Sequence, residues 1–228
     1  MRYLRLFGVA LVALVALGSV MAVSASALPT LLPNTITTFT GKSSGKTKLE
    51  RQGSLAAVEC NSAKGEGTVE ANGHLGLYHI TFEKCTAGGG ECTGLGDTTG
   101  NILSLGSYHL VFDTLKTTLA EAGVAILFLV DNVHFVCKTI IGEILNTVFL
   151  GGMVLCLVVN PTALTKRFEF SCKEGAADHP LESKYYNEAG TLVSISPLES
   201  SENEGTEAEG AQVGNATTEY TEAALLML

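Results

Sequence analysis

The residues best placed to do acid–base chemistry lie in Leu75–Gly94. Apolar and polar residues alternate through its first half, which is the pattern of a half-buried strand. The apolar face carries Tyr78, Ile80 and Phe82. The opposite face carries His79, Thr81 and Glu83, and it could supply a base, a hydroxyl and a carboxylate. A Gly-rich loop between Cys85 and Cys92 follows and predicts a tight turn.

Two further residues could complete such a site. Asp131 and His134 flank a predicted turn, and they could join His79 and Glu83 if their strands were neighbours. We call His79, Thr81, Glu83, Asp131 and His134 the candidate polar face. Isolated histidines on strands are usually ordinary surface or core residues. From the sequence we therefore assign no catalytic residue, and we expect no metal site and no cofactor.

One segment resembles two catalytic motifs without satisfying either. Gly41–Thr47 reads GKSSGKT. A phosphate-binding loop needs four residues between its glycines, and here there are only three, Lys42, Ser43 and Ser44. The segment also matches G-x-S-x-G with Ser43 as the nucleophile, but no Asp and His context follows it. We expect a solvated turn here.

Six cysteines, an even number, follow the apolar N-terminal segment. They are Cys60, Cys85, Cys92, Cys137, Cys156 and Cys172. An even number in an exported chain predicts three disulfides, and their spacings do not match a zinc site. Loop length, symmetry about Leu164 and elimination favour one set of pairs. These pairs are Cys85–Cys92, Cys156–Cys172 and Cys60–Cys137.

The N-terminus predicts export. Arg2 and Arg5 precede an apolar run that ends at Ala25-Ser26-Ala27, which is a good signal-peptidase site. We expect a helical signal peptide over residues 1–27, a β domain over 28–198, and an acidic loop with a closing C-terminal strand over 199–228. The alternative is an uncleaved membrane anchor. The expected location is therefore secreted or cell envelope.

The formal charge of −9 is concentrated near the C-terminus. Eleven acidic residues lie between Glu174 and Leu228, against the single base Lys184. An acidic segment repels phosphate backbones, and the chain has no Trp for base stacking, so we expect no nucleic-acid partner. The sequence does not identify another partner.

Short strand-like runs separated by turn residues predict an all-β fold, either an antiparallel sandwich or a closed barrel. The most apolar region, 122–159, divides into strand-sized pieces. Their nearly continuous hydrophobicity predicts strands that are covered on both faces. Its alternative interpretation is a membrane span at 139–159, weakened by Glu143 and several glycines.

Turn signals divide the rest of the chain. We expect turns at residues 62–67, at Asn72-Gly73 and at Asp131-Asn132, and a hairpin within Tyr185–Ser196. The acidic stretch at 198–212 is expected to lack hydrophobic anchors and predicts a solvated loop. The last strand should follow it, although EAALLML also contains helix-favouring residues.

The order TTFTGKSSGKTKLE, VEC, ITFEKC with a second cysteine, FVC and an acidic C-terminal stretch resembles a group of uncharacterised secreted actinobacterial proteins. The resemblance implies export and a β-rich fold, and it implies no activity or site residue. The apolar centre and the pair Cys156 and Cys172 depart from that group.

Three functions are compatible with these observations. The leading hypothesis is a secreted or cell-envelope β protein with a structural or binding role, because the chain contains no intact catalytic motif. The second is an exported hydrolase that uses the candidate polar face. The third is a membrane-anchored envelope protein.

Overall fold

The structure is a computed structural model, and its described residues cover most of the chain. They are residues 28–33, 35–51, 57–112, 123–138, 144–149, 151–159, 164–173, 184–187, 190–195, 198–202 and 208–227. The predicted signal peptide, residues 1–27, lies outside this part.

The described chain is made of strands joined by turns and loops, so the predicted all-β class is confirmed. The strands are β1 (Thr30–Leu32), β2 (Thr38–Ser43), β3 (Thr47–Arg51), β4 (Val58–Thr68), β5 (Leu75–Ala87), β6 (Gly90–Gly94), β7 (Ile102–Phe112), β8 (Val124–Val130), β9 (Val133–Lys138), β10 (Ile144–Phe149), β11 (Gly152–Val159), β12 (Thr165–Lys173), β13 (Lys184–Tyr186), β14 (Leu192–Ser194), β15 (Leu198–Glu202) and β16 (Ala208–Met227).

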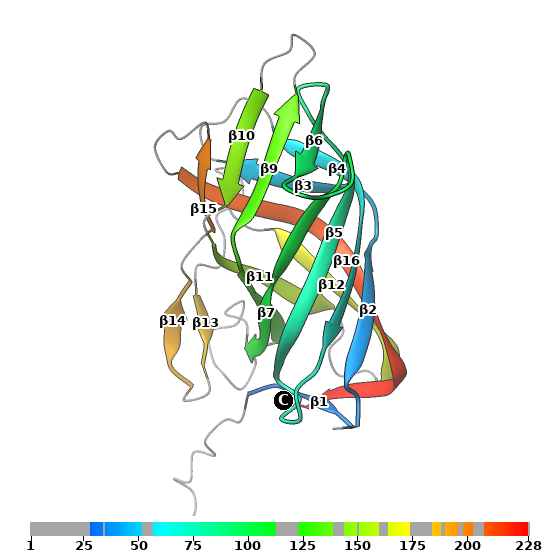
Figure 1. The fold of residues 1–228 in the computed structure, drawn as a ribbon. Coiled ribbons are helices and arrows are strands. Elements are labelled where there is room, and N and C mark those ends of the chain that lie inside the picture. The colour runs from blue at the N-terminus through cyan, green and yellow to red at the C-terminus, as the bar shows by residue number, and fades with distance from the viewer. Residues whose placement is uncertain are drawn as a thin grey trace, which may run out of the picture.

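Eight antiparallel strands close into a barrel, which we call the lower barrel (Figure 1). Its strands pair in the order β5, β7, β8, β11, β12, β16, β2, β4 and back to β5. Closure leaves none of these strands with an open edge along the circuit. Of the two predicted architectures, the chain therefore forms the barrel.

A second circuit of pairings lies above the first, and we call it the upper ring (Figure 1). It runs β5, β6, β9, β10, β15, β16, β3, β4 and back to β5. The strands β4, β5 and β16 belong to both circuits because they are long enough to span them. The two circuits thus share one continuous stretch of wall.

The C-terminal strand β16 is longer than expected and includes part of the predicted acidic loop. Leu198 and Ser200 of β15 are buried while Glu199 between them is exposed, and Glu199 pairs with Glu209 of β16. A strand can place acidic residues on its solvent face while its other face is buried. The expectation of a loop over 198–212 is therefore wrong for the described residues 198–202 and 208–212.

Two other segments predicted to be turns are part of the continuous barrel wall. Residues 62–67 lie inside β4, paired with β5 on one side and with β2 on the other. Residues 44–46 separate β2 from β3 without reversing the chain, because both strands pair with β4 and with β16. The Gly-rich composition of both segments resembles that of a turn, but here it supplies small side chains to a barrel wall.

Other turns form as predicted. Asn72-Gly73 joins β4 to β5, and Gly88 and Gly89 have φ angles of 56° and 81° in the two-residue turn between β5 and β6. A hairpin joins β13 to β14. Asp131-Asn132 is different, because β8 pairs with β7 and β11 while β9 pairs with β6 and β10. The chain there passes from the lower barrel into the upper ring without forming a hairpin.

Three disulfides cross neighbouring strands: Cys60–Cys85, Cys92–Cys137 and Cys156–Cys172. The pair across the β11–β12 hairpin was predicted correctly. The predicted pairs Cys85–Cys92 and Cys60–Cys137 are wrong. The bonds instead join cysteines that face each other across paired strands, Cys60 of β4 with Cys85 of β5 and Cys92 of β6 with Cys137 of β9. Loop length in the sequence could not reveal those strand pairings.

The main hydrophobic core fills both circuits. In the lower barrel, aromatic rings meet edge to face, with ring centroids 5.0 Å apart for Tyr78 and Phe128 and 5.6 Å apart for Phe39 and Tyr108. A smaller cluster packs on the outer side of β8 and β11, where Leu127 and Leu155 contact the segment around Ile195. These strands are therefore covered on both faces, as their nearly continuous apolar sequence predicted.

The described part of the chain holds no helix with the length and apolar character of a membrane span. Within 139–159, the described residues form β10 and β11.

Digestion of the oxidised protein without reduction should yield the three cross-strand disulfide peptides. Replacing both cysteines of a pair with Ala should lower the free energy of unfolding by about 4 kcal/mol for Cys92–Cys137, separated by 45 residues, and by about 3 kcal/mol for Cys156–Cys172, separated by 16. Mass spectrometry and urea unfolding measure these outcomes. A Cys85–Cys92 peptide would contradict the observed strand pairing.

Candidate functional site

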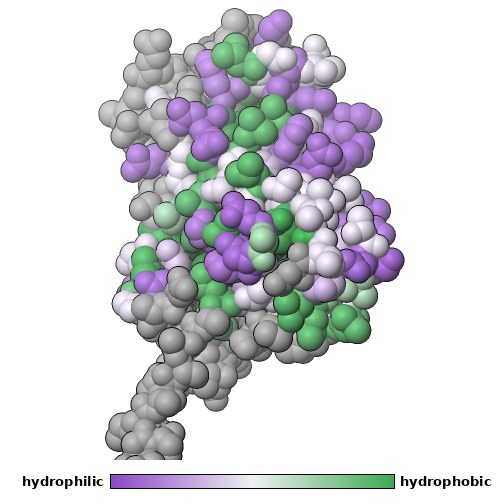
Figure 2. Space-filling model, turned by 60° about the horizontal axis from the view of Figure 1, so that its bottom comes forward, coloured by the Kyte–Doolittle hydropathy of each residue, from purple (hydrophilic) through white to green (hydrophobic). Residues whose placement is uncertain are grey.

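The outer face of β4 and β5 carries paired charges. Lys64 Nζ lies 2.8 Å from Glu83 Oε1, and the Ser62 hydroxyl donates a hydrogen bond of 2.8 Å to Glu83 Oε2. The hydrogen bond from Lys64, followed by that from Ser62, lowers the pKa of Glu83. Figure 2 shows hydrophilic residues over much of the right-hand side of the molecule and in smaller groups elsewhere, with hydrophobic residues between them. Glu83 is therefore held as a paired carboxylate in contact with water.

A shallow, open depression lies beside this pair, with a volume of about 240 Å³. It is lined by Lys64, Gly65, Glu66, His79 and Thr81. His79 Nδ1 is 3.9 Å from Glu66 Oε1, and their side chains are 48% and 73% exposed. Water surrounds both groups, so the depression lacks the desolvation that usually prepares an acid–base pair for catalysis.

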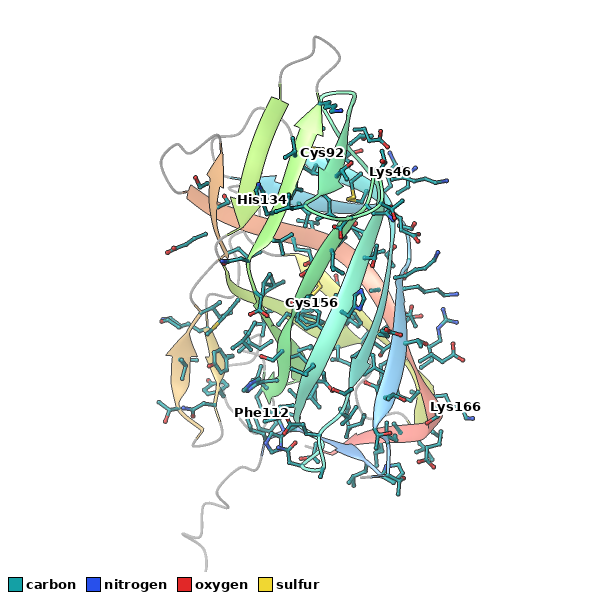
Figure 3. All side chains as sticks on the ribbon, in the orientation of Figure 1. Lys46, Cys92, Phe112, His134, Cys156 and Lys166 are labelled. Carbon is teal, nitrogen blue, oxygen red and sulfur yellow. A yellow bond between two sulfur atoms is a disulfide. The ribbon has the colours of Figure 1, made fainter. Side chains whose placement is uncertain are left out.

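The other two members of the candidate polar face lie elsewhere. The backbone N–H of Asp131 donates to the carbonyl of Leu105, and Leu105 is the residue paired with His79, so one strand separates Asp131 from His79. His134 lies on β9 in the upper ring, as Figure 3 shows. The structure thus groups His79, Thr81 and Glu83 but does not bring His134 to them. Within the described ranges, no cluster of three His, Cys, Asp or Glu residues could hold a metal ion.

A second site is inside the lower barrel, where a partly open cavity of about 70 Å³ has a mostly apolar lining. Its lining includes Phe39, Ile80, Tyr108, Ile126, Phe128 and Phe170. An empty space of this kind removes dispersion contacts from the residues around it. The core of the lower barrel is therefore incompletely filled.

Small residues at inward positions create this cavity. Gly41 pairs with Gly65, and both line the cavity together with Ala63. A Cβ added to Gly41 would have its nearest contact at 3.5 Å, so a methyl group would fit there in ordinary van der Waals contact. At Gly67, by contrast, the ring of Phe39 occupies the space that a side chain would need. The ring of Phe39 thus covers Gly67, and a Cβ placed on Gly65 would lie 3.1 Å from Ile80, so the room for a side chain is at Gly41.

Thr47 is the polar group at the upper end of this cavity. Its side chain is only 4% exposed, and its Oγ1 has no hydrogen-bond partner among the described residues. Thr47 begins β3, beside Gly214 of β16, where the lower barrel meets the upper ring. A buried hydroxyl without a partner costs free energy, so this position is unusual in an otherwise apolar interior.

The tyrosines of the same interior do have partners. The Tyr108 hydroxyl donates to the carbonyl of Thr68 at 3.1 Å, and the Tyr78 hydroxyl is 3.5 Å from Ser104 Oγ. Burial raises the pKa of Tyr78 to about 12 and that of Tyr220 to about 12, and it raises the pKa of Tyr108 as well. These phenols therefore stay neutral at ordinary pH.

The chain was compared with known proteins in three ways. No protein-family model, no curated protein and no solved structure matches it. Function must therefore be argued from the geometry of the two sites.

The sequence placed His79, Thr81 and Glu83 on one face of a strand, but it did not indicate the interior cavity. Ala63, Gly65 and Gly67 are small residues spaced two apart, which on a strand places all three on one face. This spacing of small residues in the sequence could have indicated unfilled space inside a barrel. Thr47 had no signal of its own, because its burial depends on β4 and β16 lying on either side of it.

Thr47→Val should stabilise the protein by about 1 kcal/mol, because it replaces an unpartnered buried hydroxyl with a methyl group of similar shape. Urea unfolding measures the change. Thr40→Val, on the exposed face of β2, is the matched control and should change the free energy of unfolding by less than about 0.5 kcal/mol. Destabilisation by Thr47→Val would show that the hydroxyl has a stabilising partner.

Stability should fall as the pH rises from about 10 towards 12. In this window the tyrosines of the unfolded chain lose their protons near pH 10, while Tyr78 and Tyr220 keep theirs until about pH 12. Urea midpoints across this range, with absorbance of ionised tyrosine, measure the effect. Tyr220→Phe should give a shallower decline, and an unchanged slope in this variant would contradict the assignment.

Proposed function

We propose that this chain is an exported protein that acts by binding, and that the interior of the lower barrel holds a slender apolar molecule. The observation that carries this proposal is the apolar cavity at the Gly41–Gly65 pair. Natural cores are normally close-packed, so a cavity surrounded by small inward residues favours a binding role.

The size of the cavity limits the ligand. A cavity of about 150 Å³ can hold a benzene ring. The cavity here, at about 70 Å³, is less than half that volume, but it is not fully enclosed, so it fits a narrow aliphatic chain that extends along it better than a ring. A wider molecule would require the surrounding rings, such as Phe39 and Phe128, to move.

Export is supported by two independent observations. All six cysteines form disulfides, which persist in oxidising compartments. The leader over residues 1–27 has the sequence of a signal peptide. Secretion and retention in the cell envelope are both compatible with these features. A membrane-anchored form would keep this leader, whereas a mature chain that begins at Leu28 would not.

The exported hydrolase is less well supported. Glu83 is paired with Lys64, and His79 faces water in an open depression. A hydrolase site would be expected to enclose its acid and base in a cleft that excludes water.

Binding can be tested with n-pentane as the probe. We expect n-pentane to raise the thermal midpoint of the wild-type protein and to shift the methyl NMR signals of Ile80 and Ile126, because ligands that bind only the folded state stabilise it. Gly41→Val should abolish both effects, since its methyl groups enter the open space around the missing Cβ.

The control for this experiment is Thr40→Val, which adds the same side chain to the exposed face of the same strand. It should bind n-pentane as the wild type does. Gly41→Ala adds a single methyl group and should weaken binding without abolishing it. Equal responses of the wild type and Gly41→Val would contradict binding in the cavity.

A further inference from the structure

We infer that the ligand of the lower barrel is a neutral amphiphile, with an aliphatic chain and a hydroxyl or carbonyl group that hydrogen-bonds Thr47 Oγ1. This inference rests on the proposed function and adds the chemical class of the ligand and its orientation. It is carried by two observations: the apolar cavity, and a buried hydroxyl without a described partner in its lining.

The two ends of the cavity differ in polarity. Leu31 of β1 and Leu110 of β7 line it near the lower end of the barrel, where the Leu110 N–H donates to the carbonyl of His74 beside the β4–β5 turn. Thr47 and Gln212 line it at the upper end. A molecule with one polar end would therefore place that end at Thr47 and its chain toward Leu31.

Thr47 can satisfy either kind of polar group. A hydroxyl both donates and accepts, so Thr47 Oγ1 could donate to a ligand carbonyl or pair with a ligand hydroxyl. Two other polar groups of the lining are already engaged. Ser43 Oγ donates to the carbonyl of Gly45 and accepts from the N–H of Ala63, and Asn215 Oδ1 accepts from Ser171. Thr47 Oγ1 is buried and has no described partner, so a ligand can gain a hydrogen bond there without breaking one.

The absence of buried charge favours a neutral ligand. The buried polar side chains of the described residues are all hydroxyls of Ser or Thr. The charged residues that line the cavity, Lys42, Lys64 and Glu66, are all exposed. Lys46 and Lys48, on either side of Thr47, lie 3.4 and 3.3 Å from the carboxylate of Glu59, and their side chains are 65% and 45% exposed. Figure 3 shows Lys46 at the outside of the barrel. A carboxylate or ammonium head would be buried without a counter-charge, which is unfavourable.

The inference can be tested with three probes that each have five non-hydrogen atoms: 1-butanol, n-pentane and n-butylammonium. NMR titration of the full mature protein measures their dissociation constants. We expect wild type to bind 1-butanol and n-pentane, and not n-butylammonium. Thr47→Val should weaken 1-butanol binding about tenfold and should leave n-pentane binding unchanged or tighter, because only the alcohol loses a partner.

A second measurement reports the orientation directly. In wild type, nuclear Overhauser effects should connect the C1 protons of 1-butanol to the Thr47 methyl group, and the terminal methyl of the alcohol to the apolar lining. Thr40→Val, on the exposed face of β2, is the matched control and should bind all three probes as wild type does.

The outcomes separate the two proposals. If Thr47→Val changes the affinities for 1-butanol and n-pentane by the same factor, or if the alcohol binds in the reverse orientation, the polar anchor is overturned and apolar binding stands. Tight binding of n-butylammonium would overturn the neutral class. If neither n-pentane nor 1-butanol binds wild type, the proposed function fails together with the inference.

Discussion

The hydrogen bonding of β16 to its neighbours holds this architecture together. This single strand pairs with β1, β2, β3, β12 and β15, and it closes both the lower barrel and the upper ring. A closed circuit satisfies the backbone N–H and C=O groups that an open sheet would leave at its edges. Because β4 and β5 are also shared, the two circuits cannot separate without breaking long runs of backbone pairing.

Closure also explains the internal site. A barrel of eight strands has room for side chains in its interior, and large residues must fill that room for it to be close-packed. Phe39 fills the space above Gly67, but the Gly41–Gly65 pair has no ring over it. The cavity and the isolated hydroxyl of Thr47 are consequences of where small residues meet across neighbouring strands. The charged outer face, by contrast, is organised by direct pairs such as Lys64–Glu83.

Much of the fold could be predicted from local patterns. The alternation in β5 and the apolar runs of β8 and β11 identified strands, because a side-chain period of two is a property of the chain itself. The disulfide Cys156–Cys172 was predictable because its strands form a hairpin. The prediction was wrong at residues 62–67, whose composition is typical of a turn. It was also wrong in β15, where a charge-rich stretch has one buried face. In both cases the pairing of distant strands overrode the local preference.

The sequence by itself determined the all-β class, the positions of most strands, the tight turn at Gly88-Gly89 and the inward direction of Tyr78 and Phe82. Each depends on residues close together in the chain. Only the tertiary structure decided that the sheet closes, how Cys60, Cys85, Cys92 and Cys137 pair, and that Thr47 is buried beside an apolar cavity. These properties depend on which strands become neighbours, and Cys92 and Cys137, 45 residues apart, show that neighbours in space need not be neighbours in sequence.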